Sequence, residues 1–96
     1  MAIHFEWDEV KAQANLKKHK VSFELASYVF FDPLALVYQD RIENGELRWQ
    51  TLGMVENCLV LLVAHAVQHD EVGEIIRIIS ARKADKKERK QYEENR

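Results

Sequence analysis

The sequence predicts a small α+β domain in which helices pack on an antiparallel sheet of about four to five strands. Three observations support this prediction. The chain has 96 residues, which is enough for one hydrophobic core, and we treat residues 1–96 as a single domain. Four apolar segments between residues 34 and 82 follow one another with short turns, as in an antiparallel meander. One strand and two helical segments precede them, and a charged helical segment follows them.

The first strand and the first helix are predicted from apolar spacing and capping. Ile3–Trp7 alternates large apolar residues with polar ones, which is typical of a strand with one buried face. Asp8 is a suitable N-cap for a helix over residues 9–19, which contain no Gly or Pro. Val10 and Ala14 fall on one face with Trp7 at helical spacing, so they form the apolar side of this helix.

A second helix is predicted from Ser22 to just before Pro33. Ser22 is a suitable N-cap, and Phe23, Ala26 and Phe30 form an apolar stripe that we expect to cover one face of the sheet. Pro33 ends this helix, because the residue before a proline is driven out of the helical region.

The segment from residue 34 to Arg82 predicts four strands. Asn44-Gly45 is a typical hairpin turn, and Gly73–Arg82 contains four isoleucines, as expected of a central strand. Leu47, Trp49 and Thr51 share one face of their strand by alternation. The predicted strands are residues 34–39, 47–54, 58–67 and 73–82, with turns at 40–46, 56–57 and 69–73.

The last segment, residues 84–96, predicts a charged C-terminal helix with a thin apolar stripe that Tyr92 anchors. The net charge of the whole chain is −2, but the charges are unevenly distributed. Residues 82–96 contain seven Lys/Arg and four Asp/Glu, a local charge of +3; residues 1–81 contain seven and twelve, a local charge of −5. Clustered cations can form a positive surface that the average charge conceals.

The composition excludes several classes of protein. The longest strongly apolar run, Cys58–Val67, is about half the length needed to cross a bilayer, and no secretory signal is visible. We therefore expect a cytoplasmic protein with no membrane association. The single cysteine excludes an internal disulfide and is expected to be a buried thiol. No Gly-rich phosphate loop, nucleophile elbow or zinc-ligand spacing is present, so no cofactor or metal is expected.

Arg77 and Arg82 are the main candidates for an anion-binding site. Each guanidinium stays charged in a protein, so it needs a carboxylate, a phosphate or water. One interpretation is an ion pair for each arginine; the other is a clamp that binds phosphate and stabilises charge developing on it. Five residues apart on a regular strand, the two side chains point to opposite faces. They can share a site only if the strand bends or ends near Ser80.

His65 is a candidate general acid or base at a strand end, or else a hydrogen-bonded core residue. His65 and His69 are four residues apart, which on a helix would suggest a metal site, but the strand context disfavours one. Tyr92 is either the anchor of the tail helix or an acid–base group among cations.

The cluster Lys17-Lys18-His19-Lys20 ends the first predicted helix. Cations are favoured there by the helix dipole, which is a sufficient structural explanation. The alternative is a patch that binds a nucleic-acid backbone.

Short motifs in a fixed order run along nearly the whole chain. They are Phe5-Glu6-Trp7-Asp8; Asn15-Leu16-Lys17-Lys18-His19; Val21-Ser22-Phe23-Glu24 with Ala26; Phe31-Asp32-Pro33; Arg48-Trp49 with Thr51 and Gly53; His65; Ile76-Arg77-Ile78-Ile79-Ser80-Ala81-Arg82; and Glu88-Arg89 with Tyr92. Each motif is weak alone, but the ordered set is specific and resembles the BrnT family of bacterial toxins.

This resemblance implies a fold similar to the RelE toxins and ribonuclease activity. It also implies a BrnA-type antitoxin that blocks the toxin and binds operator DNA, so that any contact of this chain with DNA is indirect. On this basis we expect His65, Arg77, Arg82 and Tyr92 to be catalytic, and Lys18 and His19 to bind RNA. As further basic residues, Lys17, Lys83 and Lys86 are expected to hold the RNA backbone.

Two positions depart from the family pattern. Lys20 replaces a glycine expected after the Lys-His pair, which disfavours a left-handed turn there. Ala66-Val67-Gln68 replaces a more polar sequence, so a cation expected near the site is missing.

A mechanism without metal fits these residues. The 2′-hydroxyl of RNA attacks the adjacent phosphate, and the protein supplies an acid or base (His65 or Tyr92) and cations (Arg77 and Arg82). The resemblance therefore implies the toxin of a type II toxin-antitoxin system, an endoribonuclease that arrests translation and growth. The alternative is a non-catalytic RNA- or protein-binding module. A stand-alone DNA regulator is disfavoured, because no helix-turn-helix pattern is present.

Overall fold

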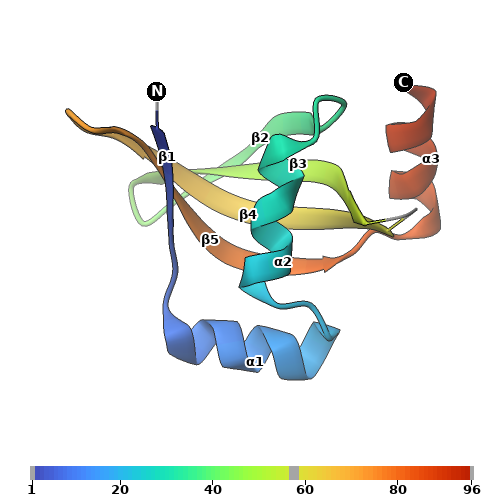
Figure 1. Cartoon of the computed structure of the whole chain (residues 1–96), viewed down its shortest axis with the longest axis horizontal. Coiled ribbons are helices and arrows are strands. Elements are labelled where there is room, and N and C mark those ends of the chain that lie inside the picture. Colours follow the sequence, from blue (N-terminus) through green and yellow to red (C-terminus); the bar gives the residue numbers. More distant parts are fainter. Residues whose placement is uncertain (1, 57–58, 96) are drawn as a thin grey trace.

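In the part of the chain that the structure describes, five strands form one sheet in the order β1-β5-β4-β3-β2, and three helices accompany it (Figure 1). The structure is a computed structural model that describes residues 2–56 and 59–95. This α+β arrangement confirms the predicted fold class. In chain order the elements are β1 (Ala2–Glu6), α1 (Glu9–His19), α2 (Phe23–Ser27), the 3-10 turn η1 (Tyr28–Phe31), β2 (Leu36–Glu43), β3 (Glu46–Glu56), β4 (Leu59–His69), β5 (Gly73–Lys83) and α3 (Lys86–Glu94).

The sheet is a meander with one added strand. β2 to β5 pair in sequence and antiparallel, as expected of strands joined by short turns. β1 pairs with the other side of β5 and runs parallel to it, because α1 and α2 carry the chain across before β2 begins. β5 therefore lies between the first strand and the meander.

One face of the sheet, which we call the helix face, is covered by α1, α2 and η1. Phe23 and Ala26 are buried in the main core, which confirms the predicted stripe, and Phe30 packs against it partly buried. Gly53 of β3 lacks a side chain where Val29 approaches; a Cβ there would lie 3.0 Å from the Val29 Cβ. The glycine thus allows η1 to pack directly on the sheet.

The buried side of α1 differs from the prediction. Its buried residues are Ala12 and Asn15, whereas Val10 is 79% exposed. Asn15 replaces apolar contact with hydrogen bonds: its side chain donates to the Ala81 carbonyl (2.8 Å) and accepts from the Ala81 amide (3.1 Å). A buried amide with both groups satisfied fixes α1 on β5.

Lys20 adopts the left-handed conformation (φ 61°) and ends α1, and its amide donates to the Leu16 carbonyl. The expectation that lysine would disfavour a left-handed turn here is therefore wrong. The helix-ending hydrogen bond compensates for the strain of a side chain in this region, which costs roughly 1–2 kcal/mol.

Two other predicted boundaries change. The predicted second helix tightens after Ser27 into η1 before Pro33. The β2–β3 turn contains only Asn44 and Gly45, both with positive φ, and β2 continues to Glu43 across an irregular register. Asp40–Glu43 therefore lies in a strand, not in a turn. Cys58 and the predicted turn residue Asn57 fall outside the described residues, so the buried thiol stays a prediction.

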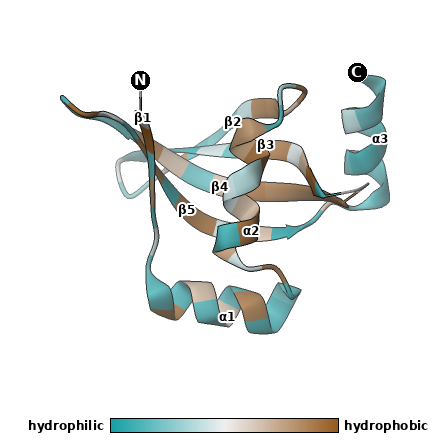
Figure 2. Ribbon diagram, in the orientation of Figure 1, coloured by the Kyte–Doolittle hydropathy of each residue, from teal (hydrophilic) through white to brown (hydrophobic). Residues whose placement is uncertain are grey.

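The C-terminal helix α3 packs against the other face of the sheet, at the end near Leu52, Val60 and Leu62. Figure 2 shows that it is mostly hydrophilic. Tyr92 is its buried residue, as predicted, and Asp85 forms a capping box with Glu88 at its start. Within the described residues, no helix is long and apolar enough to cross a membrane.

Candidate functional site

A bulge in β5 determines where the two arginines point. The β4–β5 ladder pairs Ala64 with Ser80 and His65 with Ile78, which leaves Ile79 as an extra residue. A bulge of this kind reverses the alternation of side chains beyond it.

Because of the bulge, Arg77 and Arg82 lie on the same face of the sheet. Ile76, Ile78 and Ala81 all belong to the core under the helices, so the two arginines between and beside them point the other way. The irregularity in β5 next to Ser80 thus gives the two arginines a common face, although each has a different carboxylate partner there. We call this side of the sheet the arginine face.

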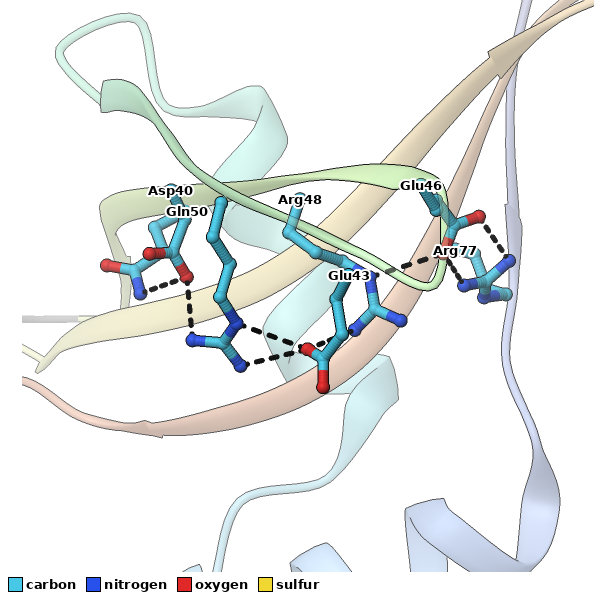
Figure 3. A network of polar contacts seen from close by, with 7 residues as sticks. Asp40, Glu43, Glu46, Arg48, Gln50 and Arg77 are labelled. Carbon is cyan, nitrogen blue, oxygen red and sulfur yellow. Dashed lines mark hydrogen bonds and ion pairs between the residues drawn. The ribbon is translucent and has the colours of Figure 1, made fainter.

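Arg77 lies in a row of alternating charges on the arginine face (Figure 3). Its guanidinium binds the Glu46 carboxylate with both terminal nitrogens, one of them at 2.9 Å. Arg48 also contacts Glu46 (Nε–Oε1 3.2 Å) and lies 3.7 Å from Glu43. Arg41 closes the row by pairing with Glu43 and with Asp40. The hydrogen bond from Arg77 lowers the pKa of Glu46, and the same bond raises the pKa of Arg77.

Arg82 is paired with a residue of the tail helix. Its two terminal nitrogens donate to the two Glu88 oxygens at 2.8 and 2.9 Å. Glu88 also accepts from the Asp85 amide, and the bond from Arg82 is the main reason that the pKa of Glu88 is lowered. Tyr38 of β2 lies near this pair; burial and then the Glu88 charge raise its pKa. The tail therefore neutralises Arg82 with a planar, bidentate anion.

A cavity of about 260 Å³ lies beside Arg82. It brings together Arg82, His19 at the end of α1, Gln50 of β3 and Ser80 of β5. The other expected cations do not line it: Lys17, Lys18, Lys83 and Lys86 are exposed side chains nearby in sequence. Of the residues expected to bind RNA, His19 is thus the one that the fold brings to an expected catalytic arginine.

His65 lies on the helix face, so the sheet separates it from Arg77 and Arg82. It is 3% exposed, and its Nε2 is 2.8 Å from the Thr51 hydroxyl. The Phe30 ring packs edge-on against the imidazole, with the two ring centroids 4.7 Å apart. Burial lowers the pKa of His65 to about 4, so the imidazole is neutral at pH 7. The structure therefore does not bring His65 together with the arginines, and its surroundings match the alternative of a core histidine.

Tyr92 lies apart from the Arg82 cavity as well. It is 2% exposed, and its hydroxyl donates to the Asp32 carboxylate at 2.5 Å. Asp32 also accepts from the Met54 amide, so this contact ties α3 to β3 and to the segment after η1. These bonds fit the predicted anchor of the tail helix.

Several residues of the arginine face were not expected from the sequence to belong to the site. The spacing Asp85-x-x-Glu88 is a recognisable capping box, and it could have placed Glu88 near the end of β5. Glu46 and Arg48 follow the Asn44-Gly45 turn, but the contact of Glu46 with Arg77, across β4, has no local signal. In the described part of the chain, no group of three or more His, Cys, Asp or Glu side chains could hold a metal ion.

Comparison with known proteins identifies the family. The family described as "Ribonuclease toxin, BrnT, of type II toxin-antitoxin system" matches residues 7–88. A search of curated proteins gave no match. Among solved structures, the crystal structure of the Brucella abortus ribonuclease toxin BrnT is similar, with a TM-score of 0.69 and 22% sequence identity; the alignment covers 88% of this chain and 100% of that chain. At that identity, the similarity establishes the fold. Because the family match spans most of the sequence, the chain belongs to the BrnT family, the ribonuclease toxins of type II toxin-antitoxin systems, and has an antitoxin as its partner.

Proposed function

We propose that this toxin is a metal-independent endoribonuclease that binds and cleaves RNA on the arginine face, acts in the cytoplasm to arrest translation and growth, and is neutralised by a BrnA-type antitoxin. The observation that carries the proposal is the bulge at Ile79, which gives Arg77 and Arg82 a common face. Two guanidinium groups on one rigid strand can bind successive parts of an RNA backbone.

The cleavage step uses the nucleophile of the substrate. The 2′-oxygen of RNA bonds to the adjacent phosphorus while the bond from phosphorus to the 5′-oxygen breaks. The 2′-hydroxyl loses its proton, and the departing 5′-oxygen gains one. The products are a 2′,3′-cyclic phosphate and a 5′-hydroxyl. The protein must therefore neutralise the charge developing on the phosphate and move protons.

Arg82 is proposed to bind the reacting phosphate. The Glu88 carboxylate now accepts from both terminal nitrogens of its guanidinium, in the same fork geometry in which a phosphate can accept. RNA would replace Glu88 there. This exchange is feasible because Glu88 belongs to a short, mostly hydrophilic helix. Arg77 has a less mobile partner, since Glu46 lies on β3 and also contacts Arg48.

His19 is proposed to move protons, because it shares the cavity with Arg82 and an imidazole can both accept and donate a proton. His65 and Tyr92, which we expected to be catalytic, support the fold in this proposal: one is buried on the opposite face and the other is bound to Asp32. The exposed cations Lys17, Lys18, Lys83 and Lys86 bind the RNA backbone electrostatically.

The proposal is tested by incubating the purified chain with a defined RNA in EDTA. We expect cleavage that leaves 2′,3′-cyclic phosphate ends, and no cleavage of the same sequence carrying 2′-O-methyl groups. The matched variant His19→Gln should cleave at least about 100-fold more slowly and still bind the methylated RNA. A strict requirement for a divalent metal, or 5′-phosphate products, would contradict the mechanism. Binding of RNA with no cleavage would favour the non-catalytic binding module.

A further inference from the structure

A second surface, on the helix face, is not used by the proposed chemistry. α2 and η1 cover the sheet only as far as His65, and beyond it lies an apolar groove of about 740 Å³. Its floor and walls come from four strands and η1. They include Val37, Trp49, Val67, Ile76 and Phe30, with His65 at the inner end.

The groove ends at the β4–β5 hairpin, which contributes Gln68, His69 and Glu74 to its lip and is acidic. The β4–β5 hairpin, residues 68–76, contains Asp70, Glu71 and Glu74 and no Lys or Arg. Glu74 lines the groove, and none of the residues that line it is a Lys or Arg. Its nearest arginine in sequence, Arg77, points to the arginine face. An apolar floor with an acidic lip repels RNA and is complementary to a peptide that has apolar and basic residues.

One wall of the groove is solvent-exposed apolar surface. Val37 of β2 is 57% exposed, and it stands across the groove from the Val67–Ile76 pair of β4 and β5. A type II toxin has a protein partner by definition of its family, and apolar surface of this kind beside a charged lip is typical of protein contacts.

We propose that the groove is the docking site for an amphipathic segment of the antitoxin. Apolar side chains of that segment enter between Val37 and Ile76, and Lys or Arg side chains flanking them pair with Glu74 and the acidic hairpin. The inference rests on the antitoxin partnership and is independent of the cleavage chemistry. Glu46, the partner of Arg77, also lines the groove at its β3 side, but no residue of the Arg82 cavity does, so this segment anchors the antitoxin without covering Arg82.

The test measures binding of the full chain to the antitoxin encoded with it, by isothermal titration calorimetry. Val37→Glu puts a carboxylate on the exposed apolar wall and should weaken binding at least about tenfold. Ile42→Glu is the matched control: it lies on the same strand, is 70% exposed, does not line the groove, and should bind normally. Glu74→Lys reverses the lip charge and should weaken binding about three- to tenfold, more at low salt than at high salt.

RNA cleavage and circular dichroism of each variant separate docking from the other activities. A natively folded variant that binds the antitoxin more weakly supports docking in the groove, whether or not the chain cleaves RNA. Absence of RNA cleavage would count against the ribonuclease proposal alone. Normal antitoxin binding by Val37→Glu and Glu74→Lys would overturn the inference. So would a dimer of the chain alone that Val37→Glu dissociates, since the groove would then bind a second copy.

Discussion

The two faces of the same strands have opposite chemistry. On the helix face, β4 contributes His65, whose imidazole is buried, neutral and hydrogen-bonded to Thr51. On the other face, β5 contributes Arg77 and Arg82, which stay charged and are neutralised by carboxylates. The sheet thus separates the buried imidazole of His65 from the cations that could stabilise a phosphate. Groups in the core stabilise the fold, whereas a partly exposed ion pair can exchange one anion for another.

The carboxylate partners of the two arginines also differ in how firmly the fold holds them. Glu46 lies on a strand, in a row of charges that also includes Arg48 and Glu43. Glu88 lies on α3, whose buried contact with the sheet depends on Tyr92. Of the two pairs, the one with Arg82 is therefore easier to open, and RNA is expected to enter there first.

The largest expected effect is the loss of RNA cleavage when an arginine of the arginine face is removed. Arg82→Ala should lower RNA cleavage about 10²–10³-fold, because it removes a donor to the charge that develops on the phosphate. Its free energy of unfolding should change by less than about 1 kcal/mol, since the pair with Glu88 is partly exposed. Single-turnover cleavage and urea titration measure the two quantities. Arg41→Ala, a 64% exposed arginine on the β2 bulge, is the control and should cleave normally. Equal rates of RNA cleavage by Arg82→Ala and Arg41→Ala would show that Arg82 has no special role in the reaction.

The next effect is the pH dependence of stability that results from the buried His65 on the helix face. The folded pKa of His65 is about 4 and the unfolded value is about 6.5, so the unfolded chain binds the additional proton between these values. Stability should be fully present above pH 6.5 and fall toward pH 4, by at most about 1.4 kcal/mol per pH unit and about 3 kcal/mol in all.

His65→Gln removes this titration, so its stability should change less with pH than that of the unmodified chain. Measurements at pH 5 and above stay above the unfolded glutamate pKa of 4.5, so the lowered pKa values of Glu46 and Glu88 add little to the pH dependence there. If urea titrations at pH 7 and pH 5 give parallel changes for both proteins, His65 is not the buried neutral group.

A smaller stability effect should come from the partner of His65. Thr51→Val preserves the shape of the buried side chain but removes the hydroxyl that bonds Nε2, and should cost about 1–3 kcal/mol of unfolding free energy. Thr51→Ser retains the hydroxyl and measures the loss of the methyl group alone. RNA cleavage at pH 7 by the folded Thr51→Val variant should be normal. A large loss of cleavage would instead connect His65 to the reaction.

The smallest effect tests exchange at Arg82. Glu88→Gln removes the competing negative charge, so affinity for a 2′-O-methyl RNA should rise about two- to fivefold. This increase corresponds to roughly 0.5–1 kcal/mol, the free energy of a partly exposed ion pair. Fluorescence anisotropy at fixed salt measures it. Glu93→Gln, on the same helix and exposed, makes the same change in net charge and is expected to raise affinity less. Equal increases would show that net charge alone matters and that Glu88 does not compete with RNA.

Local sequence was sufficient for most of the fold. Apolar alternation predicted the strands, and Asp8 and Ser22 begin α1 and α2 as expected of N-caps. The errors arose where tertiary contacts override local preference. Asn15 is buried because it bonds Ala81 across 66 positions of sequence, and Lys20 is left-handed because α1 must end before Val21 enters the core. Neither requirement is visible in the residues nearby.

What the sequence by itself determined is the family, the order of elements and the identity of the charged residues, since all of these are recorded in short-range patterns. What only the tertiary structure decided is which of these residues can act together. The bulge at Ile79 places Arg77 and Arg82 on one face, and strand pairing puts His65 behind the sheet, bonded to Thr51. A shift of one residue in a strand moves every side chain beyond it to the opposite face, so the composition of the site depends on register.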